Sequence, residues 1–153
     1  MVAWNMEKCL AIGDTYISAD DNEVFGIITD WKAIPLKRPE RLCGNAPNIE
    51  VYKYILKQID SDIIVAVQAN SPTLRQDLIQ EVYTLMQSGE YQEIMTCHKD
   101  GSIYGSIWAL TRERIKKYKD PYNPTPDILI EDRSIDIHDC DDMLLAEKQY
   151  HGY

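Results

Sequence analysis

Residues 63–72 read Ile63-Ile-Val-Ala-Val67-Gln-Ala-Asn-Ser-Pro72, and this stretch decides the fold class. A continuous apolar run rich in β-branched residues is typical of a strand that is buried on both faces of a parallel sheet. The polar run 68–72 ends the strand, and apolar residues at helical spacing follow over about 75–87. The stretch therefore predicts a strand, a loop and a helix, which is the repeating unit of an α/β fold.

The same alternation continues along the rest of the chain. Further strands are predicted at 15–18, 33–36, 93–97, 103–110 and 127–130, and further helices at 2–12, 23–31, 47–59, 112–118 and 141–150. Asn45 or Ala46 is the expected cap of the helix whose first turn contains Pro47. We predict a three-layer α/β/α fold around a doubly wound, mostly parallel sheet. Residues 1–153 are expected to form a single domain, because no repeat or composition shift marks a boundary.

Composition excludes several classes of function. The chain has 153 residues, 44% of them apolar and 27% charged, with a formal net charge of -9. This charge argues against nucleic-acid backbones and anionic membranes as partners, since both attract clustered cations. Apolar spans are too short to cross a bilayer. The four cysteines form no C-x-x-C pair, so we expect reduced thiols in a cytoplasmic protein rather than a zinc or dithiol site.

The acidic segment Ser134–Glu147 has two interpretations. If it begins as a short strand, residues 136 and 138 project to the same side, where Asp136 could hold a divalent cation. Alternatively the segment is the start of a helix, with Asp139 as N-cap and the carboxylates of Asp141 and Asp142 near the positive end of the helix dipole.

Ligands of open α/β sheets bind beyond the carboxyl ends of the strands. This rule predicts that the loops at Asp20, at 68–71 and at 136–139 form one edge of a shared pocket. Ile103 and Tyr104 are neighbours on a strand, so one is expected to face the pocket and the other the core.

Five motifs, taken together in their order, resemble the cytidylyltransferases that activate eight- and nine-carbon keto sugar acids, such as the acylneuraminate cytidylyltransferases. The motifs are Tyr16-Ile-Ser-Ala-Asp-Asp21, Lys37-Arg-Pro-Glu-Arg-Leu42, Val67-Gln-Ala-Asn-Ser-Pro72, Gly101-Ser-Ile-Tyr104 and Ile135-Asp-Ile-His-Asp-Cys-Asp-Asp142 with Ala146-Glu147. The resemblance implies a fold of the nucleotide-diphospho-sugar transferase type. It also implies transfer of CMP from CTP to a sugar acid with the help of Mg²⁺, or alternatively Mn²⁺.

The resemblance also implies roles for individual residues, although it assigns none to catalysis. Nucleotide contacts fall on Arg38 and Asn45, sugar contacts on Gln68, Asn70, Ser71 and Tyr104, and metal contacts on Asp136 and His138. Some candidate residues have a structural alternative, in which Arg38 forms an ion pair with Glu40 or another acid and Gln68 bonds to loop amides. Asp20 and Asp21 are expected to cap a helix.

Three departures from the family pattern support a second interpretation. In the family, a first strand and a glycine-rich, basic loop precede a helix, and the resemblance of this chain begins only at that helix. In addition, His138 and Asn70 stand at positions where the family has acidic residues. Without that first strand, two strand edges would lack a partner. We therefore expect a homodimer or a partner polypeptide that supplies the strand. The alternative function is a non-catalytic homologue that acts as a sugar- or nucleotide-binding regulatory subunit.

Overall fold

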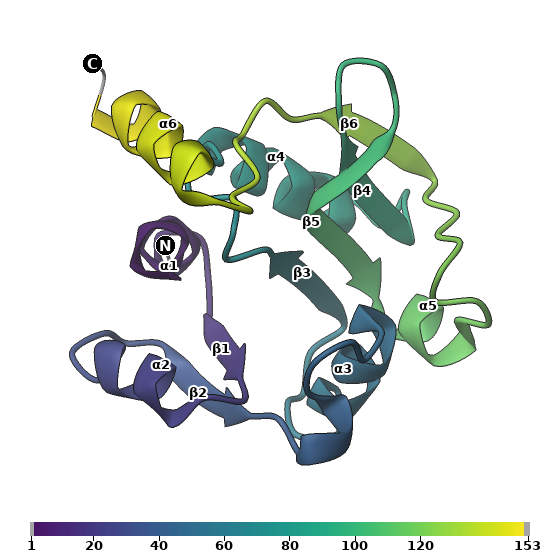
Figure 1. Ribbon diagram of the computed structural model, residues 1–153. Helices are drawn as coiled ribbons and strands as arrows, with labels where there is room; N and C mark the ends of the chain where they lie inside the picture. Colours follow the sequence, from purple (N-terminus) through teal and green to yellow (C-terminus); the bar gives the residue numbers. More distant parts are fainter. Residues whose placement is uncertain (1, 152–153) are drawn as a thin grey trace.

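The computed structural model describes residues 2–151, and its elements follow the predicted alternation (Figure 1). The strands are β1 (Tyr16–Ala19), β2 (Ile34–Lys37), β3 (Ile63–Val67), β4 (Glu93–Cys97), β5 (Ile103–Thr111) and β6 (Ile128–Glu131). The helices are α1 (Val2–Leu10), α2 (Asn22–Ile27), the 3₁₀ turn η1 (Glu40–Leu42), α3 (Asn48–Ile55), α4 (Gln76–Gln87), α5 (Arg112–Lys117) and α6 (Cys140–His151).

The strands form two separate sheets. β3, β5, β4 and β6 form a four-stranded sheet in that order, and β1 pairs with β2 in a parallel two-stranded sheet. Within the larger sheet, β5 is antiparallel to β3 and β4, whereas β4 and β6 are parallel. Three of its four strands therefore run in the same direction. The predicted α/β class is confirmed, with a sheet that is mixed because β5 inserts in the opposite direction.

Helices cover both faces of the four-stranded sheet, so the predicted three layers are confirmed (Figure 1). Consecutive residues of β5 point to opposite faces. Trp108 and Leu110 pack with residues of α3 and α5, while Ile107 and Ala109 pack with residues of α4. All four of these side chains are at most 5% exposed. The core therefore lies on both sides of β4 and β5.

β3 corrects one expectation from the sequence. All five of its residues are half-buried rather than buried, although their side chains contact the core on both faces. The reason is the position of β3 at the end of the sheet, with a partner on one side only. An apolar run indicates contact with two helical layers, but it does not distinguish a central strand from an edge strand.

Helix bounds also differ from the prediction, most of all those of α2 and of α3, which ends at Ile55 rather than near residue 59. α2 ends at Ile27 rather than near residue 31, and the Thr29 hydroxyl donates to the Phe25 and Gly26 carbonyls, which competes with helical pairing. Neither Asn45 nor Ala46 caps α3, because Pro47 itself is the extended residue before the helix. Within residues 2–151, no helix combines the length and the apolar character that a bilayer crossing requires.

Candidate functional site

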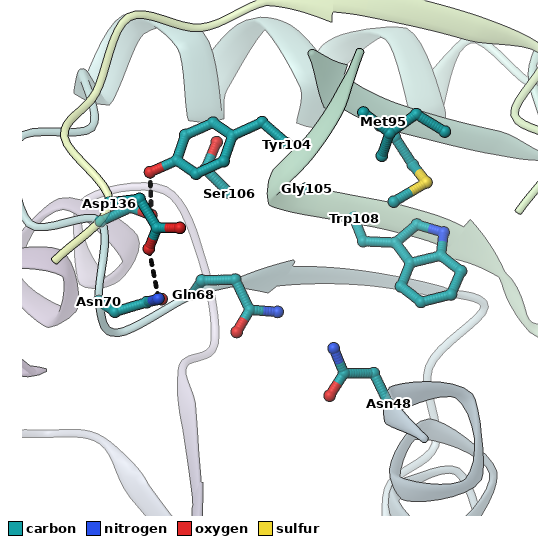
Figure 2. A pocket seen from close by; sticks show the side chains of 11 residues that line it. Asn48, Gln68, Asn70, Met95, Tyr104, Gly105, Ser106, Trp108 and Asp136 are labelled. Atoms are coloured by element: carbon teal, nitrogen blue, oxygen red, sulfur yellow. Dashed lines mark hydrogen bonds between the residues drawn. The ribbon is translucent and has the colours of Figure 1, made fainter. Parts of the chain in front are cut away.

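One pocket lies beyond the end of β3, against β5 and the segment that follows β6 (Figure 2). Its cavity volume is about 250 Å³. It is lined by Asn48, Gln68, Asn70, Ser71, Met95, Ile103, Tyr104, Gly105, Ser106, Trp108 and Asp136. Four residues that the resemblance associates with the sugar and one that it associates with the metal are thus gathered in a single cavity. The carboxyl-end rule predicts that the loops at 68–71 and 136–139 meet, but the loop at Asp20, which was expected to join them, does not line the cavity.

A β-bulge shapes the wall of this pocket. The pairing of β4 with β5 shifts register between Met95 and Cys97, opposite Gly105, which has φ of +72°. Bulges are common beside functional sites because they redirect side chains. Here the strict alternation is lost, and both Ile103 and Tyr104 line the pocket. The expectation that one of the two faces the core was wrong for this reason.

Tyr104 is fixed by contacts on its ring and on its hydroxyl. Its ring stacks on His98, with 4.7 Å between centroids and 17° between planes. Its hydroxyl lies 2.8 Å from the Ser71 hydroxyl, and Ser71 is 1% exposed. Burial, with the charges of Asp136 and Asp132, raises the pKa of Tyr104, so the phenol stays protonated at neutral pH.

Asp136 is held by the loop that follows β3. The Asn70 side-chain amide donates to Asp136 Oδ1 at 2.5 Å, and the backbone N–H of Ile137 donates to the Asn70 carbonyl at 2.9 Å. The Ile135 N–H donates to the Thr73 hydroxyl at 2.8 Å. These bonds join two loops that are more than sixty residues apart in the chain. Residues 134–138 are irregular rather than the short strand that we predicted.

The acids around α6 divide between the two predicted roles. Asp139 Oδ1 accepts from the backbone N–H groups of Asp141 and Asp142, so the capping interpretation is confirmed for this residue. Asp136 instead lies in the pocket, with its Oδ2 2.8 Å from Nε2 of His138, whose side chain is 73% exposed. Over the part of the chain that the structure describes, no cluster of three or more His, Cys, Asp or Glu side chains could hold a metal ion.

The predicted nucleotide contacts lie outside this pocket. Arg38 forms an ion pair of 3.2 Å with Asp20, as its structural alternative predicts, and neither residue lines the cavity. The Nε atom of Arg38 is buried and has no hydrogen-bond partner among the described residues. Asn45 is exposed. Asp21 caps α2 by accepting from the Glu23 N–H at 2.8 Å.

Sequence reasoning missed two buried residues that support the pocket. The Asn5 side chain, 5% exposed, donates to the carbonyls of Gln68 and Ser71 at 2.8 and 3.0 Å and thereby fixes the loop after β3. Asp132, 4% exposed, accepts from the Ser106 hydroxyl at 2.5 Å. A polar residue within an apolar helical stripe was the available signal for Asn5, whereas the sequence around Asp132 carries no comparable signal.

Comparisons with known proteins bear on the fold. No family model matches the chain, and no curated protein matches it by sequence. Among solved structures, it is similar to a CMP:2-keto-3-deoxy-manno-octonic acid synthetase complexed with CTP, with a TM-score of 0.71 and 12% identity over 99% of this chain and 87% of that one. It is also similar to a cytidylyltransferase from Leptospira borgpetersenii serovar Hardjo-bovis (strain JB197), with a TM-score of 0.58 and 15% identity over 79% of this chain and 55% of that one. The fold that the sequence resemblance predicts is therefore confirmed.

Proposed function

We propose that this protein is a nucleotidyltransferase that transfers CMP from CTP to a hydroxyl group of a sialic-acid-like keto sugar acid and releases pyrophosphate. The observation that carries the proposal is the convergence of Gln68, Asn70, Ser71, Tyr104 and Asp136 on one pocket. A fold shared with a synthetase that was solved with CTP adds support.

The polar side chains of the pocket suit a sugar. The amides of Gln68 and Asn70 can both donate to and accept from hydroxyl groups, and Ile103, which is 42% exposed, offers an apolar surface to a sugar ring. Arg38 and Asn45 are proposed to contact the nucleotide beyond the cavity, where the partly exposed guanidinium group of Arg38 could donate hydrogen bonds to a phosphate.

We propose Mg²⁺ as the cation, with Mn²⁺ as the alternative. Mg²⁺ is usually held by one or two carboxylates together with substrate phosphates and water. Asp136 and His138 offer one carboxylate and one imidazole, a donor set that fits a cation arriving with the nucleotide and that favours Mn²⁺ where the imidazole takes part. Such a cation would neutralise charge that develops on the phosphates.

Incubation with CTP, Mg²⁺ and N-acetylneuraminic acid, followed by an assay for pyrophosphate, tests this function. We expect release that requires both substrates and falls by at least about tenfold in Asp136→Asn, since Asp136 is the one carboxylate among the eleven described residues that line the pocket. The same substitution at Asp127 would not serve as the control, because the Asp127 carboxylate accepts from the backbone N–H groups of Gln92 and Glu93 and so holds the start of β4. Glu50→Gln, on the exposed face of α3, is the control and should keep full activity.

The alternative function is binding without turnover, in a sugar- or nucleotide-binding regulatory subunit. Calorimetric titration with CTP and with the sugar acid distinguishes the two. Binding of either ligand with no pyrophosphate release in the presence of Mg²⁺ or Mn²⁺ would contradict the transferase and favour the regulatory subunit.

The unpaired edge of β3 supports a homodimer or a partner polypeptide that adds a strand. The Gln68 N–H donates to Ser106 in β5, so by antiparallel alternation the backbone groups of Ile63, Val65 and Val67 point away from β5. Within residues 2–151 no strand pairs with this edge. The two-stranded sheet lies on the side of β3 that faces away from β5, which is the side of the unpaired edge (Figure 1). Exposed apolar edges recruit further strands. Sedimentation equilibrium should give a mass above 17.7 kDa for an assembled form, and a monodisperse monomer would contradict this assembly.

A further inference from the structure

A second cavity lies between α3 and α5, two helices that pack against each other (Figure 1). Its volume is about 480 Å³, compared with about 250 Å³ for the pocket beyond β3. Five cations and one acid are among its lining residues: Arg41, Lys53, Lys57, Arg112, Lys116 and Glu50. We call this cavity the basic groove. No residue lines both cavities, so the two are separate.

The charge of the basic groove is opposite to that of the chain as a whole. The chain has a formal net charge of -9 and 16 Lys and Arg residues, of which five line this one groove. The pocket beyond β3 differs, because Asp136 is the one charged residue among those that line it. Since charges act mainly within the Debye length of about 8 Å, an anion is attracted to the groove and repelled from the pocket.

Arg112 holds the end of α3 rather than offering its charge to a ligand. Carbonyl groups at the C-terminal end of a helix lack partners within the helix and carry partial negative charge. The Arg112 guanidinium group donates to the carbonyls of Ser61 at 2.8 Å and Ile59 at 3.1 Å. It also donates, at 3.5 Å, to the carbonyl of Leu56, which caps the C-terminus of α3, and it pairs with Asp60 at 3.4 Å. These bonds offset the negative end of α3, which would otherwise oppose an anion in the groove.

The other four cations are unpaired or are held only weakly. Arg41 and Lys57 form no ion pair with any acid of residues 2–151. Lys53 and Lys116 each pair with an exposed glutamate of the same helix, at 2.7 and 3.1 Å. Exposed ion pairs of this kind are worth up to about 1 kcal/mol, so both lysines can turn to a bound anion at little cost.

The core fixes the floor of the basic groove. Leu56 and Ile115, which are 8% and 0% exposed, line the groove and belong to the same buried cluster as Trp108. The Tyr54 ring also lines it, and the guanidinium carbon of Arg41 lies 5.9 Å from the centre of that ring, within range of a cation–π contact. This contact orients Arg41 without neutralising its charge. The volume of about 480 Å³ lies within the roughly 300–1,000 Å³ of ligand pockets, so the groove has room for more than a single phosphate group.

We propose that the basic groove is a second binding site, which takes the polyphosphate group of a small ligand, either inorganic pyrophosphate or a nucleoside triphosphate. Arg41 and Lys57 are the main contacts, because both can donate charge-assisted hydrogen bonds to phosphate oxygens and neither has a competing acid. Lys53 and Lys116 add positive charge from α3 and α5. The inference goes beyond the proposed function and does not rest on it, since the groove shares no residue with the pocket beyond β3.

Calorimetric titration with inorganic pyrophosphate, without nucleotide and without divalent cations, tests this site. We expect binding that weakens by at least about fivefold when the ionic strength is raised from about 0.05 M to about 0.3 M, because salt screens the attraction. A parallel titration with CTP distinguishes the two sources of polyphosphate. An affinity for CTP that is more than about tenfold higher would assign the site to a nucleotide, whereas equal affinities would assign it to the polyphosphate alone.

Two substitutions test the contacts. Arg41→Gln and Lys57→Gln should each weaken pyrophosphate binding by at least about threefold, the effect of losing one exposed ionic contact. Lys148→Gln is the matched control, since it makes the same change in net charge at an exposed lysine of α6, away from α3 and α5 (Figure 1). It should leave the affinity within about 1.5-fold of the original value. Thermal unfolding checks that each variant is folded, and all three side chains are exposed.

Amide NMR titration with pyrophosphate shows where the ion binds. We expect the largest shift changes at Lys57 and Lys116, and none at Gln68 and Asn70. Three results would overturn the inference: no binding at millimolar pyrophosphate, shift changes confined to the pocket beyond β3, or equal losses of affinity in Lys148→Gln and Lys57→Gln. The outcome is distinguishable from the assay for pyrophosphate release, because the groove can bind whether or not the chain transfers CMP.

Discussion

In the four-stranded sheet, buried polar side chains form several hydrogen bonds each, whereas in the two-stranded sheet they do not. Glu93 of β4, which is fully buried, accepts from the side chains of Arg114, Trp108 and Tyr118 at 2.7 to 3.0 Å. By contrast, Ser18 Oγ in β1 and Arg38 Nε after β2 are buried and have no partner among the described residues.

β4, in the four-stranded sheet, is also more deeply buried than β2, in the two-stranded sheet. Every residue of β4 is buried, whereas β2 has one buried residue and Ile34 is 46% exposed. Unsatisfied buried polar groups are rare in native proteins and call for an explanation. The comparison indicates that the polar side chains buried in the larger sheet are satisfied within the described residues, whereas two polar atoms buried in the region of β1 and β2 are not.

Glu93→Ala should have the largest effect on the larger sheet. It removes the charge that Arg114 pairs with and leaves the Trp108 and Tyr118 donors unsatisfied. We expect the free energy of unfolding to fall by about 3 kcal/mol, near the lower end for a broken buried pair because Arg114 is 30% exposed. Urea denaturation measures this change. Glu50→Ala, at an exposed pair with Lys53, should cost about 0.5 kcal/mol or less, and an equal loss in both variants would contradict the comparison.

Ser106→Ala should have the next largest effect. Ser106 links Asp132, 2.5 Å away, with Thr96, 2.8 Å away, and all three side chains are buried. The change leaves the carboxylate with one donor fewer, and we expect a loss of about 2 kcal/mol in urea denaturation. Unchanged stability would mean that the hydroxyl contributes nothing to holding Asp132.

Gly105→Ala should cost about 1–2 kcal/mol, because an L side chain is strained at φ of +72°. The new Cβ would also lie 3.4 Å from Met95 Cε, in the wall of the pocket. Gly89→Ala is the matched control, with φ of +76° and no atom within 4 Å of its Cβ. Both variants should lose stability, but only Gly105→Ala should weaken ligand binding by titration; equal effects on binding would argue against a role for the bulge.

Ser18→Ala should have the smallest effect, within about 0.5 kcal/mol, or should stabilise slightly. Its hydroxyl is buried without a partner, so removing it relieves a desolvation cost. It is the counterpart of Ser106→Ala in the other region. A loss above about 1 kcal/mol in urea denaturation would show that Ser18 is satisfied in solution, for example in an assembly.

The local sequence pattern was sufficient to predict the helices and strands, but not which strands lie next to each other in the sheet. Every predicted strand from 15–18 to 127–130 has a counterpart, because apolar periodicity is a property of adjacent residues. The insertion of β5 between β3 and β4 depends on pairings between residues up to about fifty positions apart, such as Ile63 with Thr111, and no local signal encodes them. The edge position of β3 was missed for the same reason.

The site divides in a similar way. Gln68 and Asp136 could be predicted, since the ends of strands and the resemblance both pointed to them. Asp132 could not, because its importance depends on two serines, Ser106 and Ser134, that only the folded chain brings to it. The metal role of His138 remains a prediction.

The most direct test of the central claim, that the pocket beyond β3 is where sugar and nucleotide meet, is an amide NMR titration with CTP, Mg²⁺ and N-acetylneuraminic acid. We predict that the largest shift changes fall on the backbone amides of Gln68, Asn70, Gly105 and Asp136, which line the pocket. Changes concentrated instead on the basic groove between α3 and α5, around Arg41 and Lys57, with none at these four amides, would contradict the account.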